Sequence, residues 1–299
     1  MAKEHLVITG SSGFVGSNLY HALKGSFRVT GLSRNPSPTT DELIDLTDAE
    51  KTLVLVSRLK PDIIIHCAAL TNVEYCETHQ EEARLNNVQA TANILNAINK
   101  ETYFIYLSTD YVYPGTDGTY TEESPVLPGS YYGQTKLEAE KLVRKQQEHA
   151  LILRSTVIFG WDPHGHNFFM QLYRKQASKE RMLVPSDQIS NPTYIKTLVE
   201  VIRRSIDKGL EGTYNATGNV ALDRYHFALR IADAFGWGTS FIHPVLTTDL
   251  GQVAQRPLNC STVNALIQKR LGFSLPSLDK ELDDLRSVIA DINVKEAIP

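Results

Sequence analysis

The chain has 299 residues, of which 42% are hydrophobic and 21% are charged, and its formal net charge is −4. This length suits one large α/β unit, or a nucleotide-binding domain joined to a smaller lobe. The balance of 30 basic and 34 acidic residues, without a basic stripe, argues against nucleic-acid binding and favours a small-molecule partner. No apolar run approaches the roughly 20 residues that span a bilayer, and no secretion signal is recognisable. We therefore expect a soluble cytoplasmic protein with no membrane partner.

The first half of the chain alternates short β-branched runs with amphipathic helical stretches. In chain order, the pattern predicts strand His5 to Thr9, helix Phe14 to Leu23, strand Arg28 to Gly31, helix Ala49 to Leu59, strand Ile63 to His66, helix Gln80 to Asn99, strand Tyr103 to Leu107, helix Tyr131 to Glu148 and strand Leu151 to Arg154. This alternation predicts the α/β class, with a doubly wound and mainly parallel sheet of the Rossmann type. We expect an NADP-binding Rossmann domain over residues 1–155, rejoined by a segment near residues 190–217.

After Ser155 the alternation loosens, and proline, glycine and histidine become frequent. Helical patterns cover Phe168 to Ser178, Tyr194 to Ile206 and Arg224 to Phe235, with short strands between them. These features predict a smaller C-terminal α/β lobe, within residues 156–299, that mainly binds substrate.

The histidines and cysteines show no metal-binding pattern. His164 and His166 flank a glycine in a predicted loop, but no carboxylate or cysteine nearby completes a ligand set. The three cysteines, Cys67, Cys76 and Cys260, lack metal-ligand spacing. We expect solvated histidines, reduced thiols and no metal site.

A glycine-rich segment, TGSSGFVG, follows the first predicted strand and contains Gly10, Gly13 and Gly16. Gly10 permits a tight turn, Gly13 lets the backbone approach a pyrophosphate, and Gly16 allows the following helix to pack on the sheet. The N-terminus of that helix supplies unpaired N–H donors for an anion. The segment therefore predicts a dinucleotide site, although a glycine triplet alone is also compatible with a purely structural turn.

The second predicted strand ends in GLSR, without the carboxylate that would bind an adenine ribose hydroxyl group. The Arg34 guanidinium can instead donate a forked pair of hydrogen bonds to a 2′-phosphate. We therefore expect NADP(H) to be preferred, with NAD(H) still open and a solvated loop charge as the other interpretation of Arg34. Asp45, in LIDLTD, is expected to reach the adenine amino group.

The segment SYYGQTKLEAE places Tyr132 and Lys136 four residues apart at the start of a predicted helix. Residues at this spacing share a helix face, so the ammonium group can lie beside the phenol and favour its ionised form. Tyr131 lies on another face and receives no role. Upstream, LSTDYVYPG places Thr109 and Asp110 after a parallel strand, where ligand crevices form. A surface Tyr/Lys pair and a simple turn cap are the alternatives.

Together these motifs resemble the extended short-chain dehydrogenase/reductases. The resemblance rests on TGSSGFVG, HCAAL at His66–Leu70, ARLNNVQATANIL around Asn87, LSTDYVY and the Tyr132/Lys136 pair. Within that superfamily the chain is similar to the dTDP-4-dehydrorhamnose reductases, through STDYVYPG, the DLTD at Asp45, VPSDQISNPTY from Val184 to Tyr194 and QRPLNCS from Gln255 to Ser261. The resemblance implies NADPH-dependent reduction of a nucleotide-linked 4-keto-sugar, and a homodimer as the family-level expectation.

The resemblance also implies roles for individual residues. Tyr132 would protonate the nascent alkoxide, Lys136 would hold the nicotinamide ribose and lower the phenol pKa, and Thr109 would orient the carbonyl. Asp110 would contact the sugar, and Arg256 would clamp a diphosphate unless it is a surface residue. The cofactor-binding residues expected are Gly10, Ser12, Gly13, Phe14, Val15, Gly16, Ser33, Arg34, Asp45, Leu46, Cys67, Ala68, Ala69, Asn87, Tyr132 and Lys136.

Two departures from related patterns bear on the substrate. Sugar-nucleotide 4,6-dehydratases carry Thr-Asp-Glu where this chain has Tyr111 as the third residue, which argues against dehydration. Val157 stands where the rhamnose reductases carry a substrate-contacting Trp, so the sugar itself is not determined; Trp161 is a packing residue or a substitute.

Two other functions remain open. The regulatory β subunit of methionine adenosyltransferase resembles the same subfamily, keeps the fold and the NADP site, and acts by binding a partner enzyme. The intact set of Thr109, Tyr132 and Lys136 favours an enzyme. A sugar-nucleotide epimerase, or another reductase, would differ in cofactor preference and in the stereochemistry of its product.

Overall fold

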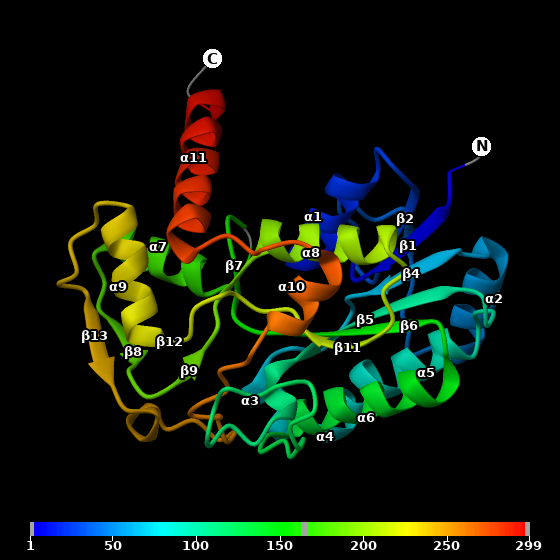
Figure 1. Ribbon diagram of the computed structural model, residues 1–299, viewed down its shortest axis with the longest axis horizontal. Coiled ribbons are helices and arrows are strands. Elements are labelled where there is room, and N and C mark those ends of the chain that lie inside the picture. Colours follow the sequence, from blue (N-terminus) through cyan, green and yellow to red (C-terminus); the bar gives the residue numbers. More distant parts are fainter. Residues whose placement is uncertain (1–2, 163–164, 166, 297–299) are drawn as a thin grey trace.

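The computed structural model describes residues 3–162, 165 and 167–296, so His164 and His166 lie outside the described residues. Its centre is a seven-stranded parallel sheet with the order β11-β6-β5-β4-β1-β2-β3 (Figure 1). The strands are β1 His5–Thr9, β2 Arg28–Ser33, β3 Glu42–Leu43, β4 Ile63–His66, β5 Tyr103–Thr109, β6 Ala150–Ser155 and β11 Gly212–Asn215. The predicted doubly wound parallel sheet is confirmed. The strand order reverses between β1 and β4, which is where such sheets open a ligand crevice.

Helices cover both faces of this sheet. One face carries α1 (Phe14–Leu23), α8 (Ile195–Asp207) and α10 (Ala265–Leu271); the other carries α2 (Ala49–Leu59), α5 (Ala90–Leu95) and α6 (Tyr131–Gln146). Figure 1 shows α1 and α8 on one side of the sheet and α5 and α6 on the other. Alternate residues of β4 fill the two cores, since Ile63 and Ile65 pack on one side and Ile64 on the other. This double burial explains the unbroken apolar run Ile63 to Ile65 of β4.

The helix predicted over Gln80 to Asn99 is not continuous. It is divided into α4 (Gln80–Arg84), a π-helical segment η1 (Leu85–Gln89) and α5. A π-helical turn contains one more residue than an α-helical turn and so shifts the register of the side chains. The shift turns Asn87 into the protein interior, where only 1% of it is exposed.

The C-terminal part forms a second core beside the sheet. Its elements are β7 Ile158–Phe159, α7 Phe168–Ser178, β8 Met182–Pro185, β9 Ile189–Ser190, β10 Thr193–Tyr194, β12 Leu222–Asp223, α9 Arg224–Ala234, β13 Ile242–Val245 and α11 Leu278–Glu296. The short strands pair as β7/β10, β8/β13 and β9/β12. Three further short elements are α3 Val73–Thr78, η2 Asp110–Val112 and η3 Thr247–Leu250. Figure 1 shows α7, α9, β8 and β13 grouped on one side of the molecule.

The two parts are interleaved in sequence. After β10 the chain returns to the main sheet, where α8 packs against α1 and β11 pairs with β6. The C-terminal half thus supplies one edge strand of the seven-stranded sheet. Among the described residues, no helix combines the length and the apolar character that crossing a bilayer requires.

Helix α11 docks on α8 through a buried carboxyl group. Glu281 is 3% exposed and accepts a hydrogen bond from Thr197 Oγ1 at 2.5 Å. Burial raises the pKa of Glu281 to about 7, above the value of about 4.3 for an unfolded chain. The folded chain therefore binds this proton more tightly than the unfolded chain does, and stability is lost as the pH rises from about 4 to about 7.

We expect Glu281→Gln to stabilise the protein by roughly 2–3 kcal/mol at about pH 8 and to change its stability little at about pH 4. The amide carries no charge and can still accept the hydrogen bond from Thr197. Urea unfolding at the two pH values measures the difference, with the exposed Asp283→Asn as the control. Equal effects of the Glu281 substitution at both pH values would contradict the raised pKa of Glu281.

Candidate active site

Two adjoining cavities lie along the carboxyl ends of the parallel strands. The first, of about 200 Å³, contacts the glycine loop and the end of β2 and is called the glycine-loop cavity. The second, of about 480 Å³, contains Tyr132 and is called the tyrosine cavity. Gly10, Gly13, Cys67 and Ala69 line both, so the two form one continuous crevice. Its size is that of a small-molecule site.

The structure places nearly all of the predicted site residues in this crevice. The glycine-loop cavity is lined by Gly10, Ser12, Gly13, Ser33, Arg34, Asp45, Leu46, Cys67, Ala68 and Ala69. The tyrosine cavity is lined by Gly10, Gly13, Phe14, Val15, Gly16, Cys67, Ala69, Thr109, Asp110, Tyr132, Lys136 and Arg256. Asn87 lines neither cavity.

Close backbone approach explains the glycines. Gly10 has a φ of 64°, and a Cβ atom there would lie 2.8 Å from the backbone nitrogen of Ala68. A Cβ atom at Gly16 would lie 2.2 Å from the carbonyl oxygen of Gly10. Helix α1 begins directly after Gly13 without a side-chain cap. Its first N–H groups are therefore available to an anion in the crevice.

The end of β2 offers hydroxyl groups and a guanidinium. Ser12 Oγ and Ser33 Oγ share a hydrogen bond at 2.5 Å, and Arg34 lines the same cavity with an exposed side chain. Asp45 is the carboxylate of this cavity, and its Oδ1 accepts hydrogen bonds from the backbone nitrogen and Oγ1 of Thr47. The bond from the Thr47 backbone holds the pKa of Asp45 below its usual value. This donor set fits a phosphate beside Arg34.

Asn87 lines neither of the two cavities, and its expected contact with a cofactor stays a prediction. Its amide bridges the HCAAL loop and helix α6, because Oδ1 accepts from Leu70 N at 2.7 Å and Nδ2 donates to Thr135 Oγ1 at 3.0 Å. Thr135 in turn donates to the carbonyl of Tyr132 at 2.8 Å. The register shift of η1 turns Asn86 toward the glycine-loop cavity in its place.

Tyr132 and Thr109 meet at the floor of the tyrosine cavity. Ser130 caps α6, its Oγ accepting from Gly133 N at 3.2 Å, which sets Tyr132 in the first helical turn. Thr109 is the last residue of β5, two residues beyond the predicted strand end, and its Oγ1 donates to Asp110 Oδ1 at 3.0 Å. Tyr132 and Thr109 are buried, at 9% and 6% exposure, and both line the tyrosine cavity. The phenol and the threonine hydroxyl group therefore border the same crevice.

Lys136 lies differently from the predicted contact with the phenol. Its Nζ donates to the carbonyl of Leu107 at 2.6 Å and lies 4.2 Å from the ring centroid of Tyr106. Burial lowers the pKa of Lys136 to about 7, while the Glu140 carboxylate opposes this shift. Burial also raises the pKa of Tyr132 above its ordinary value, although the hydrogen bond with Thr109 opposes the change. The extended lysine stem reaches the strand rather than the neighbouring helical turn, so the phenol is not ionised by it here.

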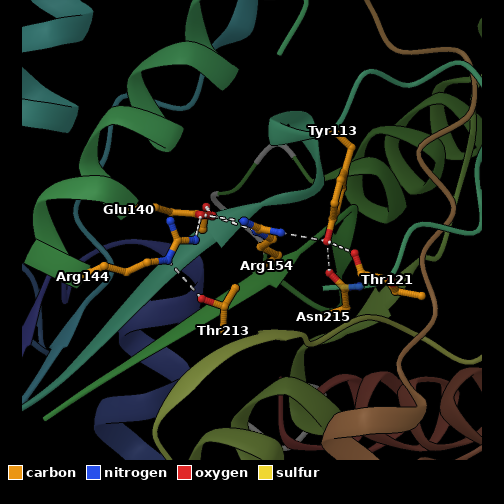
Figure 2. A network of polar contacts seen from close by, with 8 residues as sticks. Tyr113, Thr121, Glu140, Arg144, Arg154, Thr213 and Asn215 are labelled. Atoms are coloured by element: carbon orange, nitrogen blue, oxygen red, sulfur yellow. Dashed lines mark hydrogen bonds and ion pairs between the residues drawn. The ribbon is translucent and has the colours of Figure 1, made fainter. Parts of the chain in front are cut away.

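A buried ion pair between Glu140 and Arg154 joins helix α6, which carries Tyr132 and Lys136, to strand β6 (Figure 2). Glu140 lies one helical turn after Lys136, and it accepts hydrogen bonds from Arg154 Nε at 2.9 Å and Nη2 at 2.8 Å. It also accepts from Ser108 Oγ at 2.6 Å. Burial alone would raise the pKa of Glu140, but the hydrogen bonds and charge of Arg154 hold it below its usual value. The pair fixes the residue that precedes Thr109.

Figure 2 shows that the network continues across the sheet. Arg154 Nη1 donates to the Tyr113 hydroxyl at 2.9 Å, and that hydroxyl is also within 2.8 Å of Asn215 Oδ1. On the surface of α6, Arg144 forms a second ion pair with Glu140. Strands β5, β6 and β11 and helix α6 are therefore joined by one set of polar contacts. Sequence reasoning missed Glu140 and Arg154; the i, i+4 spacing from Lys136 could have indicated Glu140.

Asp110 and Arg256 both line the tyrosine cavity, as expected of substrate-binding residues. Asp110 is 1% exposed, and its burial raises its pKa to about 6, opposed by hydrogen bonds from Thr156 and Thr109. Arg256 donates to Glu74 Oε1 at 2.9 Å and has a side-chain exposure of 15%, which rules out the surface interpretation. Its guanidinium therefore already has a carboxylate partner.

Val157 and Trp161 are the two residues that the sequence analysis related to the identity of the sugar. Val157 lines the cavity and has a φ of 43°, a strained conformation for a β-branched residue of the kind that clusters at functional sites. Trp161 packs edge-on against Tyr173 with 5.3 Å between ring centroids, among the residues of the C-terminal core. Trp161 is thus a packing residue in this structure.

The sheet order, the glycine loop and the Thr109/Tyr132/Lys136 constellation define a member of the extended short-chain dehydrogenase/reductase class. The chain belongs to the RmlD substrate binding domain family, which it matches over residues 4–290.

The similar proteins include enzymes and a regulatory subunit. A crystal structure of dTDP-4-dehydrorhamnose reductase from Bacillus anthracis, in complex with NADP, superposes with a TM-score of 0.88 at 28% identity, over 95% of this chain and 99% of that one. Methionine adenosyltransferase 2 subunit beta from Xenopus tropicalis is 33% identical over 89% of this chain and 84% of its own length. A probable low-salt glycan biosynthesis reductase, Agl14 of Haloferax volcanii, is 29% identical over 95% and 98%.

Proposed function

We propose that this protein is an NADPH-dependent reductase of a nucleotide-linked 4-keto-sugar, similar to dTDP-4-dehydrorhamnose reductase. The observation that carries the proposal is that Thr109, Tyr132 and Lys136 line one cavity that is continuous with the glycine loop. A pure binding module has no need of a phenol and a threonine hydroxyl group in such a crevice. The reductases among the structural neighbours give the substrate class.

The glycine-loop cavity fits a dinucleotide with a 2′-phosphate. Gly10 and Gly16 leave no room for side chains where a pyrophosphate would pass, and Arg34 with Ser12 and Ser33 would hold the phosphate. When bound, a nicotinamide cofactor supplies the hydride. NADP(H) is the proposed cofactor, since the Bacillus anthracis reductase was crystallised with it; NAD(H) is the alternative that the next experiment tests.

Arg34→Ala is expected to raise KM for NADPH by about tenfold while leaving KM for NADH nearly unchanged, because only NADPH carries the phosphate. Steady-state kinetics with each cofactor measure the two KM values, and NADH serves as the internal control. A parallel rise for both cofactors would indicate a general structural defect, and no change for either would exclude Arg34 from the site.

The chain's own residues would direct the reduction. Thr109 orients the carbonyl through its hydroxyl group, and the Tyr132 O–H gives its proton to the oxygen that becomes an alkoxide. The high pKa that burial gives Tyr132 keeps this proton in place until the oxygen needs it. Lys136 would hold the ribose beside the nicotinamide, and Asp110 would bind a sugar hydroxyl group.

The experiment is NADPH oxidation, followed by absorbance, with dTDP-4-dehydro-L-rhamnose as substrate. Turnover with an alcohol product supports the proposal, and its absence in a folded protein that binds NADPH contradicts it.

A second candidate function comes from the relatives that are methionine adenosyltransferase β subunits. It predicts a stable complex with a methionine adenosyltransferase, detectable by size-exclusion chromatography, together with no reductase activity. A complex without turnover would establish that function in place of the first.

A further inference from the structure

Arg224 is a second arginine of the tyrosine cavity, and no motif of the sequence singles it out. It is the first residue of α9, and its backbone nitrogen donates to the carbonyl of Gln188 at 3.1 Å. Its guanidinium lies over the ring of Phe168, 5.4 Å from the ring centroid. The backbone and the stem of Arg224 are thus held in place before any ligand binds.

Among the described residues, the Arg224 guanidinium forms no ion pair with a carboxylate, although Asp110 is near enough to interact with its charge. Among the described residues it makes the ring contact with Phe168 but no ion pair and no hydrogen bond. Arg256, on the other side of the cavity, is paired with Glu74. A half-buried cation favours an anionic partner, and proteins normally pair such groups. Arg224 therefore differs from Arg256, whose guanidinium is already paired with Glu74.

The charge of the tyrosine cavity also favours an anionic ligand. Three cationic side chains line it, Lys136, Arg224 and Arg256, against one carboxylate, Asp110. Asp110 lines the same cavity as Arg224 and Tyr132 and is near enough to interact electrostatically with both. A cavity with this excess of positive charge attracts anions.

Three buried polar atoms of residues that line cavities with Arg224 also lack hydrogen-bond partners among the described residues, namely Asp110 Oδ2, Ser190 Oγ and Arg256 Nε. Ser190 and Arg224 line a side cavity of about 10 Å³, which holds at most about one water molecule. A ligand must therefore reach Arg224 from the tyrosine cavity, on the same side as Tyr132.

We propose that Arg224 binds an anionic group of the substrate, through phosphate oxygens of the diphosphate or a carboxylate on the sugar. The inference rests on the proposed function in taking the ligand to be a nucleotide sugar. Arg224 is thereby a substrate-binding residue that determines specificity, in addition to Arg256. The forked guanidinium gives two parallel charge-assisted hydrogen bonds to either group.

The test is isothermal titration of the NADP-saturated protein with dTDP, UDP-glucose and UDP-glucuronic acid. Arg224→Met retains an unbranched stem over Phe168 and removes the charge. It is expected to weaken binding by at least about tenfold. Arg230→Met is the matched control, because Arg230 lies on the same helix, is exposed and pairs with Asp279. The control is expected to bind like the wild type.

The ligands separate the two anion sources. An equal loss for all three assigns Arg224 to the diphosphate, and a loss confined to UDP-glucuronic acid assigns it to a sugar carboxylate. Unchanged affinities in Arg224→Met would overturn the proposal, and so would a wild type that binds none of the three. An Arg224 that only balanced Asp110 would alter the pH dependence of activity and leave these affinities unchanged. Because binding is measured without turnover, a failed reductase assay does not decide this result.

Discussion

Tyr132→Phe is expected to lower kcat by about 10²–10⁴-fold, the usual contribution of a general acid. Phenylalanine fills the same volume but cannot give a proton to the carbonyl oxygen. NADPH affinity should change little, because the phenol hydroxyl group is one of many contacts along the crevice. Single-turnover NADPH oxidation, with NADPH binding followed by fluorescence, measures the two quantities separately.

The neighbouring Tyr131→Phe is the matched control. Tyr131 is the adjacent tyrosine in the first turn of α6, its backbone nitrogen bonds to Glu77, and it lines neither cavity. Its substitution should leave kcat within about twofold of the wild type. A Tyr132→Phe variant that reduces the keto-sugar at the rate of the Tyr131 variant would remove Tyr132 from the proton-transfer step.

Arg154→Met is expected to destabilise the protein by about 3–5 kcal/mol, because it leaves the Glu140 carboxylate buried without its principal partner. Glu140 is 0% exposed, and Arg154 supplies two of its hydrogen bonds. The Tyr113 hydroxyl group also loses a donor. Urea unfolding followed by circular dichroism measures the loss.

The double variant Glu140→Gln/Arg154→Met separates charge from packing. Removing both charges should recover part of the lost stability, since a neutral buried amide costs less than an unpaired carboxylate. A single Arg154→Met variant within about 1 kcal/mol of the wild type would show that Arg144 and solvent are sufficient to stabilise Glu140.

Much of the fold could be predicted from local pattern. The helices Phe14–Leu23, Ala49–Leu59 and Phe168–Ser178 have the predicted bounds, and Asp48 and Asn167 cap the last two through side-chain hydrogen bonds. Such caps and periodic apolar faces are properties of neighbouring residues and are readable in sequence. The cavity-lining positions of the glycine loop follow from the same kind of local reasoning.

Other features depend on contacts between distant segments. Nothing in the local pattern around Leu85 indicates a π-helical turn, and the bridge that Asn87 forms between Leu70 and Thr135 joins segments far apart in the sequence. The choice of Leu107 rather than Tyr132 as the partner of Lys136 likewise depends on how far α6 lies from β5. The division at residue 155 into a cofactor part and a substrate part remains a prediction.

The most direct measurement of the proposed reduction is deuterium transfer from NADPH labelled at the nicotinamide C4 position. With dTDP-4-dehydro-L-rhamnose as substrate, the proposed reaction places the deuterium on C4 of the sugar in the wild type and not in Tyr132→Phe within the same time. A folded wild type that binds NADPH but leaves C4 unlabelled, while binding a methionine adenosyltransferase, would show that the protein is a regulatory subunit.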